Sequence, residues 1–207
     1  QKRIVIPYGM DNYLFKKKSK KIIPRKNAIF TSNPMRGLDW LLDQWDKNIY
    51  PQCPDSKLII FSGFQTYGSF GRKHADRINR ILLKARSLKN KGVLLRDPVN
   101  RKKLFKNIES SRVFLYKGSK DETFCMALAE SQLLGVPAIV CDFGCMNERV
   151  INNKTGYVCK NDSEFCSRTV DLLQNDRLWS KMNKESLKRK NYFNWNEVAK
   201  KWQKILN

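Results

Sequence analysis

The sequence has few of the residues that build metal or redox centres. It contains one histidine, His74, and it has no CxxC pair and no cysteine–histidine spacing of the kind that binds zinc. We therefore expect no metal site. The six cysteines are expected to be reduced thiols in the core or loops of an intracellular protein, and they are Cys53, Cys125, Cys141, Cys145, Cys159 and Cys166.

Long apolar runs and a secretion signal are also missing. No stretch approaches the roughly 18 apolar residues of a membrane-spanning helix. The first residues, QKRIVIPYG, lack the layout of a signal peptide and do not begin with Met. We expect a fragment of a longer cytoplasmic polypeptide, and contact with the inner face of a membrane is a further hypothesis.

Acidic residues are scarce, since 19 Asp and Glu stand against 41 Lys and Arg, for a net charge of +22. Nine basic residues against one acid give residues 1–26 a net +8, and eight against two give residues 180–207 a net +6. The densest run is KKKSKK, Lys16 to Lys21. This distribution favours a solvated tail or an anionic surface over a central nucleic-acid groove. Biased codon usage in a Lys- and Asn-rich sequence explains it equally well.

No glycine-rich phosphate loop is present. In GFQTYGSFG (63–71), Gly68 is followed by Ser69 and not by the Lys of a Walker loop, and the pattern GxGxxG does not occur. We predict that residues 63–71 form a flexible loop over a cleft.

Short β-rich runs alternate with amphipathic helical runs along the chain. Extended segments are predicted at 4–7, 27–31, 57–62, 92–96, 112–116, 136–142 and 155–159. Helices are predicted at 37–45, 74–88, 101–110, 126–134, 163–175, 177–191 and 195–206. Apolar strands without alternation are typical of parallel sheets buried on both faces. The pattern predicts an α/β fold, a Rossmann-like doubly wound parallel sheet.

Ligands of such sheets bind beyond the carboxyl ends of the strands. This rule selects the loops 31–37, 62–73, 96–101 and 117–124. In the first, Arg36 stands at a helix start, where a guanidinium and free backbone N–H groups could hold phosphate. A plain helix cap with an exposed arginine is the alternative.

Two glutamates frame the fourth loop and the helix after it, KGSKDETFCMALAE (117–130). Glu122 could act as a helix cap, which would contribute about 0.3–1 kcal/mol. Glu130 lies among apolar residues, where a carboxylate needs polar partners. Sugar hydroxyls are suitable partners, because acidic residues near strand ends bind ribose in dinucleotide folds.

Together these segments resemble the retaining GT-B glycosyltransferases, especially glycosyltransferase family 4. The resemblance rests on E-x7-E from Glu122 to Glu130 followed by GVPAIVCD, on IPYGMD (6–11), on RGLDWLL (36–42), on NERVINNKTGYVC (147–159) and on FNWNEVAKKW (193–202). These motifs occur in the family's order over most of the chain. The resemblance implies the C-terminal, donor-binding half of such an enzyme, with residues 1–26 as an interdomain linker, 27–192 as the nucleotide-sugar domain and 193–207 as the C-terminal helix.

The resemblance also implies roles for individual residues. Glu122 would lie beside the donor sugar as a catalytic residue, Arg36 would hold the diphosphate, and Glu130 would accept the ribose hydroxyls. The remaining donor-binding positions would be Gly63 and Thr123, the backbone N–H groups of Phe124, Cys125 and Met126, and Arg96 to Pro98 beside the base. The family transfers its sugar with retention and without a divalent metal, so no cofactor is expected. Partners would be a nucleotide sugar, a glycan or lipid acceptor bound through a missing N-terminal half, and an anionic membrane surface.

Three positions depart from the family pattern. Thr31-Ser32 replaces Gly-Arg, which removes one phosphate-binding cation, while Cys125 and Cys145 each replace a glycine. These changes keep open a degenerate, non-catalytic domain used for binding or assembly. A basic nucleic-acid-binding module is a further alternative, but it would need exposed aromatics. The tryptophans stand at helical core spacing instead (40, 45, 179, 195 and 202), so no nucleic acid is expected.

Overall fold

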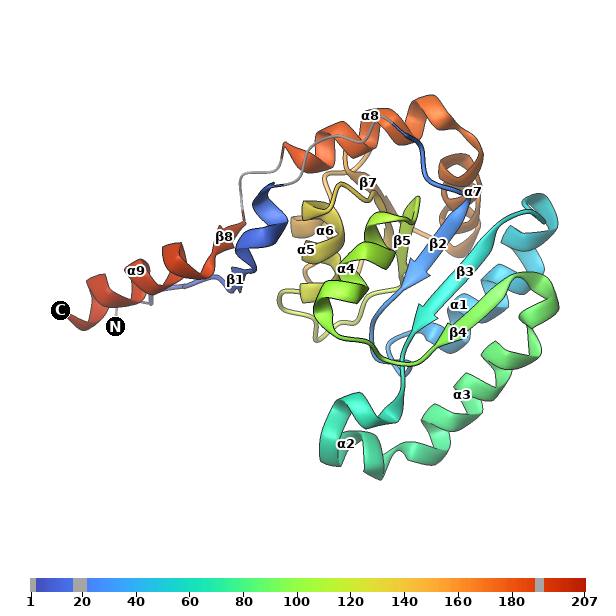
Figure 1. The fold of residues 1–207 in the computed structure, drawn as a ribbon, viewed down its shortest axis with the longest axis horizontal. Helices are drawn as coiled ribbons and strands as arrows, with labels where there is room; N and C mark the ends of the chain where they lie inside the picture. The colour runs from blue at the N-terminus through green and yellow to red at the C-terminus, as the bar shows by residue number, and fades with distance from the viewer. Residues whose placement is uncertain (1–2, 17–21, 189–191) are drawn as a thin grey trace.

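The centre of the molecule is a sheet of six parallel strands in the order β4-β3-β2-β5-β6-β7 (Figure 1). The computed structural model describes residues 3–16, 22–188 and 192–207. The six strands are β2 (Asn27–Phe30), β3 (Lys57–Phe61), β4 (Val93–Arg96), β5 (Val113–Tyr116), β6 (Ala138–Cys141) and β7 (Gly156–Cys159). The predicted doubly wound α/β fold is confirmed.

The apolar runs of the sequence form the middle of this sheet. All four residues of β5 and of β6 are buried, whereas the edge strand β4 ends in half-buried and exposed residues. A strand with neighbours on both sides and helices on both faces exposes no side chains, so only apolar runs suit it. This is why these strands were recognisable without alternation.

Helices cover both faces of the sheet. They are α1 (Leu38–Gln44), α2 (Gly68–Lys73), α3 (Ala75–Ser87), α4 (Arg101–Glu109), α5 (Met126–Leu133), α6 (Met146–Arg149), α7 (Asp162–Gln174), α8 (Asp176–Leu187) and α9 (Trp195–Leu206). Shorter helical segments are η1 (Asn12–Lys16), η2 (Trp45–Ile49), η3 (Tyr50–Gln52), η4 (Phe64–Tyr67) and η5 (Lys89–Lys91). Helix α1 packs against α3, while α5 packs against α4 and α8. Right-handed crossovers place these two groups on opposite faces.

The prediction of a flexible loop at 63–71 is wrong. The chain there forms η4 and then α2, which folds back closely on η4. A Cβ atom on Gly71 would lie 1.9 Å from the carbonyl oxygen of Phe64, so only glycine permits this approach. Gly71, which suggested a loop, therefore serves close packing between two helical turns, whereas Gly68 has open space around it and a φ of +54°.

The extended segment predicted at 4–7 is not a strand either. The first strand is β1 (Gly9–Met10), which pairs in parallel with β8 (Phe193–Asn194). The side chain of Trp195 packs directly on Gly9, where a Cβ atom would lie 2.5 Å from the indole. This short pair joins the two ends of the chain, and α9 extends from it away from the sheet (Figure 1).

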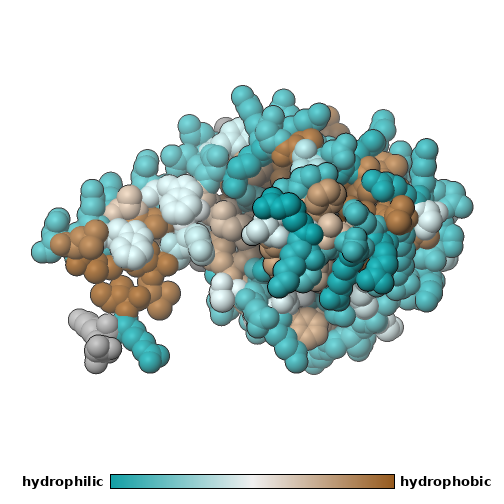
Figure 2. All heavy atoms as spheres, turned by 90° about the horizontal axis from the view of Figure 1, so that it is seen from below, coloured by the Kyte–Doolittle hydropathy of each residue, from teal (hydrophilic) through white to brown (hydrophobic). Residues whose placement is uncertain are grey.

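The tryptophans divide between the sheet region and this projecting helix. Trp45 and Trp179 are fully buried, as their spacing predicts, but Trp195 and Trp202 are each 52% exposed. The prediction of core positions is wrong for these two, because α9 projects from the body and has one side free. Exposed Ile205 and Leu206 extend the same apolar surface, which is visible on the projecting arm in Figure 2.

Two further observations concern membranes. Among the described residues, no helix has both the length and the apolar character needed to cross a bilayer. Of the basic run that suggested an anionic surface, Lys16 ends η1, and residues 17–21 lie outside the described part of the chain.

Candidate functional site

The four loops selected from the sequence follow four neighbouring strands, β4, β3, β2 and β5. Their carboxyl ends meet at one edge of the sheet. The chain runs from β2 toward β4 on one side and from β5 toward β7 on the other, so the order reverses between β2 and β5. A doubly wound sheet opens a crevice at such a switch point. Arg36 follows β2 and Glu122 follows β5, so both border this crevice.

Arg36 and Glu122 are in direct contact across the switch point. An Nη1–H group of Arg36 donates to Oε2 of Glu122, and the hydroxyl of Tyr116 donates to the same oxygen at 2.7 Å. The Glu122 side chain is 11% exposed and that of Arg36 is 44% exposed. Burial acts to lower the pKa of Arg36, but the bonds to Tyr116 and Glu122 more than offset it and raise that pKa.

Tyr116 is the last residue of β5 and is fully buried. Burial raises the pKa of its hydroxyl well above the ordinary value, and the neighbouring Cys125 and the Glu122 carboxylate raise it further. The hydroxyl therefore stays protonated and acts as a permanent donor to Glu122. This contact fixes the carboxylate from the protein side.

The backbone of Glu122 is held by its own loop and by the loop after β6. Its N–H donates to the carbonyl of Ser119 at 3.1 Å, and its carbonyl accepts from the N–H of Cys145 at 3.0 Å. Gly144 sits so close that a Cβ atom would lie 2.5 Å from the Ser119 oxygen. Glu122 is thus part of a rigid turn and does not cap α5, which begins at Met126.

Glu130 occupies the interior of α5 and is 6% exposed. An Nη2–H group of Arg101, from the start of α4, donates to its Oε1 at 2.5 Å. Burial raises the pKa of Glu130; the Arg101 charge opposes this and the Asp11 carboxylate adds to it. The sequence therefore identified a buried carboxylate correctly but missed its protein partner.

The segment between the two glutamates contains the predicted donor-facing positions. Thr123 is exposed, Phe124 and Cys125 are buried, and Met126 is half-buried. Arg149 lies 4.2 Å from the centre of the Phe124 ring. This stacking fixes the aromatic ring beside the start of α5.

The two cysteines that replace glycines differ in backbone conformation. Cys125 has φ 58°, in the left-handed region that favours glycine, while Cys145 has φ −84°, which any residue adopts. The expected crowding thus takes the form of backbone strain at Cys125 and has no counterpart at Cys145. Burial raises the pKa of the Cys125 thiol, with the Glu122 charge as the next cause, so this thiol is unreactive.

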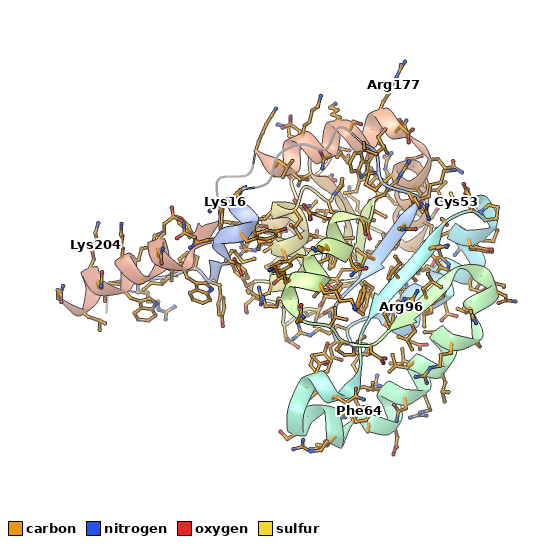
Figure 3. All side chains as sticks on the ribbon, in the orientation of Figure 1. Lys16, Cys53, Phe64, Arg96, Arg177 and Lys204 are labelled. Carbon is orange, nitrogen blue, oxygen red and sulfur yellow. The ribbon has the colours of Figure 1, made fainter. Side chains whose placement is uncertain are left out.

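The predicted base-contacting loop, Arg96 to Pro98, meets the predicted donor-binding Gly63 at the β4 end of this edge of the sheet. A Cβ atom on Gly63 would lie 3.3 Å from the ring of Pro98, so the loops after β3 and β4 touch there. Gly63, Phe64 and Arg96 line one cavity of about 570 Å³, and the latter two are labelled in Figure 3. The site residues thus form a row from the β4 end to the β5 end.

Sequence reasoning missed three residues at this edge: Tyr116, Arg101 and Lys117. In the sequence, Tyr116 resembles an ordinary aromatic residue of a core strand. The one feature that could have indicated a role in the site is its hydroxyl group at the carboxyl end of the strand. Lys117, next along the chain, has its ammonium 4.9 Å from the centre of the Trp40 ring. It is a second cation near Arg36, where Thr31-Ser32 supplies none.

The cysteines and acidic groups do not suggest other chemistry. All six cysteines are free and buried. Within the described ranges, no group of three or more His, Cys, Asp or Glu side chains is placed to hold a metal ion.

Comparison with known proteins gives a family and a set of similar structures. The sequence profile described as glycosyl transferases group 1 matches residues 15–192. The structure of HepE from Anabaena in complex with UDP-glucose matches 98% of this chain and 57% of its own, with a TM-score of 0.77 and 14% identity. A mutant of TarM from S. aureus, solved with fondaparinux, α-GlcNAc-glycerol and UDP, matches 99% of this chain and 39% of its own, with a TM-score of 0.71 and 16% identity. No match was found among curated proteins.

A glycosyltransferase from Rickettsia africae ESF-5 is similar over 98% of this chain and 56% of its own, with a TM-score of 0.71 and 15% identity. At such identities the likeness shows the shared GT-B fold. The chain spans between 39% and 57% of the length of these three proteins.

Proposed function

The chain belongs to the family of glycosyl transferases group 1, and from this premise we propose that it is the donor-binding half of a retaining hexosyltransferase. Its substrate is a nucleoside-diphosphate sugar, bound in the crevice between the ends of β2 and β5. The contact of Arg36 with Glu122 across that crevice is the observation that supports this most directly. The N-terminal half of the enzyme binds a glycan or lipid acceptor.

Charge stabilisation is the main task of this half. The difficult step is the departure of a nucleoside diphosphate from the anomeric carbon, which builds negative charge on the phosphates. Arg36 borders the crevice, and its half-exposed side chain can turn toward a diphosphate. No divalent metal is required in this scheme, because guanidinium and backbone N–H donors neutralise the leaving group.

Donor binding exchanges one partner of Arg36 for another. In the unliganded site Arg36 is bonded to Glu122, and an incoming diphosphate competes for the same guanidinium. Glu122 keeps its bond to Tyr116 when Arg36 moves, so its carboxylate stays at the crevice without losing every partner. It then faces the transferred sugar, where it stabilises positive charge at the anomeric carbon.

Glu130 accepts the ribose hydroxyls. It is nearly buried, and its one bonded partner among the residues that the structure describes is the half-exposed Arg101 side chain, which can move aside. The base lies toward Gly63, Arg96 and Pro98. Uridine is the first base to test, because the similar HepE and TarM structures contain UDP-glucose and UDP.

A calorimetric titration of this chain with UDP, GDP and ADP tests the proposal. We expect UDP to bind, and Glu130→Ala to weaken binding about tenfold or more, because hydrogen bonds to a charged group contribute about 1.5–3 kcal/mol. The matched control is Glu185→Ala on α8, which removes the same charge from a half-buried surface position paired with Lys188. Unchanged UDP affinity in Glu130→Ala would remove the ribose assignment.

A non-catalytic binding domain is the second candidate, and the left-handed Cys125 favours it. Its side chain stands where the related enzymes bring bare backbone close to the donor. Such a domain would bind nucleotide weakly or not at all, and Cys125→Gly would restore affinity. No gain in this variant, together with tight UDP binding by the unaltered chain, would favour the enzyme.

The basic ends of the chain support a contact with an anionic membrane. Co-sedimentation with anionic vesicles, with and without the run Lys16 to Lys21, measures this contact. A nucleic-acid module is distinguished by salt, since its affinity falls steeply with ionic strength while nucleotide binding in a pocket changes little.

A further inference from the structure

The charge of the middle of the chain is concentrated on one hairpin. Residues 68–89, which span α2, α3 and the first residue of η5, contain seven Lys or Arg and a single acid, Asp76. Lys84 is neutralised by Asp39 and Asp43 at 2.6 and 2.8 Å. The hairpin is therefore a third basic region, in addition to the two basic ends of the chain.

Four cations of this hairpin, at the end of α2 and in the first half of α3, have no ion-pair partner among the described residues. They are Arg72, Lys73, Arg77 and Arg80. All four are exposed. Arg77 and Arg80 are three residues apart on one side of α3, where like charges repel each other. An anion bound between the two guanidinium groups would relieve this repulsion.

Arg77 and Arg80 border a groove between α1 and α3. The groove has a volume of about 490 Å³, and its other wall includes Pro34, Met35 and Trp40. Asp39 also lines it, but this carboxylate is bonded to Lys84 and leaves the groove positive.

The groove adjoins the candidate site. Gly37, which also lines it, directly follows Arg36 in the chain. Helix α3 runs antiparallel to the strands, so its first turn lies at the same edge of the sheet as their carboxyl ends (Figure 1). A molecule held in the groove therefore lies next to the donor crevice.

We propose that this groove binds a phosphate or sulfate group of the acceptor, so that the acceptor of this transferase is an anionic glycan. The inference rests on the proposed function and specifies its second substrate. Arg77 and Arg80 supply forked N–H donors that match the oxygens of such a group. Arg72 and Lys73 attract a chain of further anionic groups toward the site.

Two other anionic partners fit the hairpin less well. A membrane-binding surface needs a continuous apolar side between its cations, but only Phe70 and Leu83 are exposed large apolar residues on α2 and α3. Single-stranded nucleic acid needs several stacking rings, and Phe70 is the one exposed aromatic there, already 4.5 Å from the His74 ring.

The test is a titration of the whole chain with a sulfated oligosaccharide, its unsulfated counterpart and inorganic phosphate, at physiological salt. We expect the sulfated glycan to bind at least about tenfold more tightly than the unsulfated one, and Arg77→Gln with Arg80→Gln to remove most of that difference. The control is Arg177→Gln with Lys181→Gln on α8, which changes the charge equally on a helix that lies away from α1 and α3 (Figure 1). Circular dichroism checks that both double variants are folded.

The outcomes separate this proposal from the proposed function. Equal losses in both double variants would reduce the binding to net charge and overturn the groove assignment. Binding of inorganic phosphate without preference for the sulfated glycan would overturn the acceptor assignment. The acceptor assignment would also be overturned if binding to anionic vesicles required Arg77 and Arg80 while binding to the sulfated glycan did not. A parallel UDP titration tests the proposed function separately. If UDP does not bind while the sulfated glycan binds through the groove, the proposed donor-binding function is wrong and the anion site remains.

Discussion

Glu122 and Glu130 each pair with one arginine, but the protein supports the two carboxylates differently. Glu122 accepts from both Tyr116 and Arg36, and a rigid turn holds its backbone. Glu130 is bonded to Arg101 alone among the described residues, and burial raises its pKa. Glu122 is therefore integrated into the fold, while Glu130 is a costly residue where an apolar one would pack better. Such unsupported buried carboxylates are typical of sites that await a ligand.

The largest expected effect distinguishes the two arginines. Arg36→Gln should weaken UDP binding roughly 10–100-fold, because a charge-assisted contact to phosphate contributes about 1.5–3 kcal/mol. Arg101→Gln should change the affinity less than about threefold, since Arg101 competes with ribose for Glu130 and is more than half exposed. Calorimetry measures both variants. Equal losses of UDP affinity in the two variants would mean that the Arg36–Glu122 and Arg101–Glu130 pairs contribute equally to donor binding, which contradicts the difference argued above.

A smaller effect is expected from removing the hydrogen bond that the Tyr116 hydroxyl donates to Glu122, since Glu130 has no equivalent bond among the described residues. Tyr116→Phe removes the hydroxyl and should lower the free energy of unfolding by about 1.5–2 kcal/mol, as expected for a bond to a charged group. In a Glu122→Gln background the same change should cost less, because the acceptor is then neutral. Urea denaturation of the four proteins gives the coupling. If Tyr116→Phe costs the same in both backgrounds, the bond does not support Glu122.

The segment between the two carboxylates provides the next test. Cys125→Gly should be more stable than Cys125→Ala by about 1 kcal/mol, since both lose the thiol and only glycine relieves the left-handed backbone. Cys145 is the matched control, because its backbone is ordinary and Cys145→Gly should be less stable than Cys145→Ala. The same order at both positions would show that the strain at Cys125 has no measurable cost. Thermal unfolding of the four variants is sufficient.

The fold could be predicted because burial leaves a mark on the sequence. Strands such as β5 and β6 are apolar throughout, since both their faces are covered. Helix α2 was missed because Gly71 allows close packing against η4, which composition cannot distinguish from flexibility. Strands β1 and β8 were missed because each has two residues and exists only through a partner far along the chain.

The candidate site was only partly predictable for a similar reason. The eight-residue spacing of Glu122 and Glu130 is local and can be read directly. Their partners Arg36 and Arg101 are 86 and 29 residues away, and only the folded sheet brings them into contact. The position of Arg36 followed from the strand-end rule, but its bond to Glu122 did not.

The smallest expected effect is the destabilisation that results from burying the Glu130 carboxylate. The direction in which this effect changes with pH follows from the raised pKa of Glu130. The folded protein binds the Glu130 proton more tightly than the unfolded chain, so this residue contributes most to stability below its unfolded pKa. That contribution is lost as pH rises through the folded pKa. Relative to the unaltered chain, Glu130→Gln should therefore gain stability as pH rises above about 4.5, with a plateau once the folded carboxyl has ionised. Urea denaturation across this range measures the difference. A difference for Glu130→Gln that stays constant or shrinks with pH would show that Arg101 fully compensates its burial, and Glu130 would then be as well supported as Glu122.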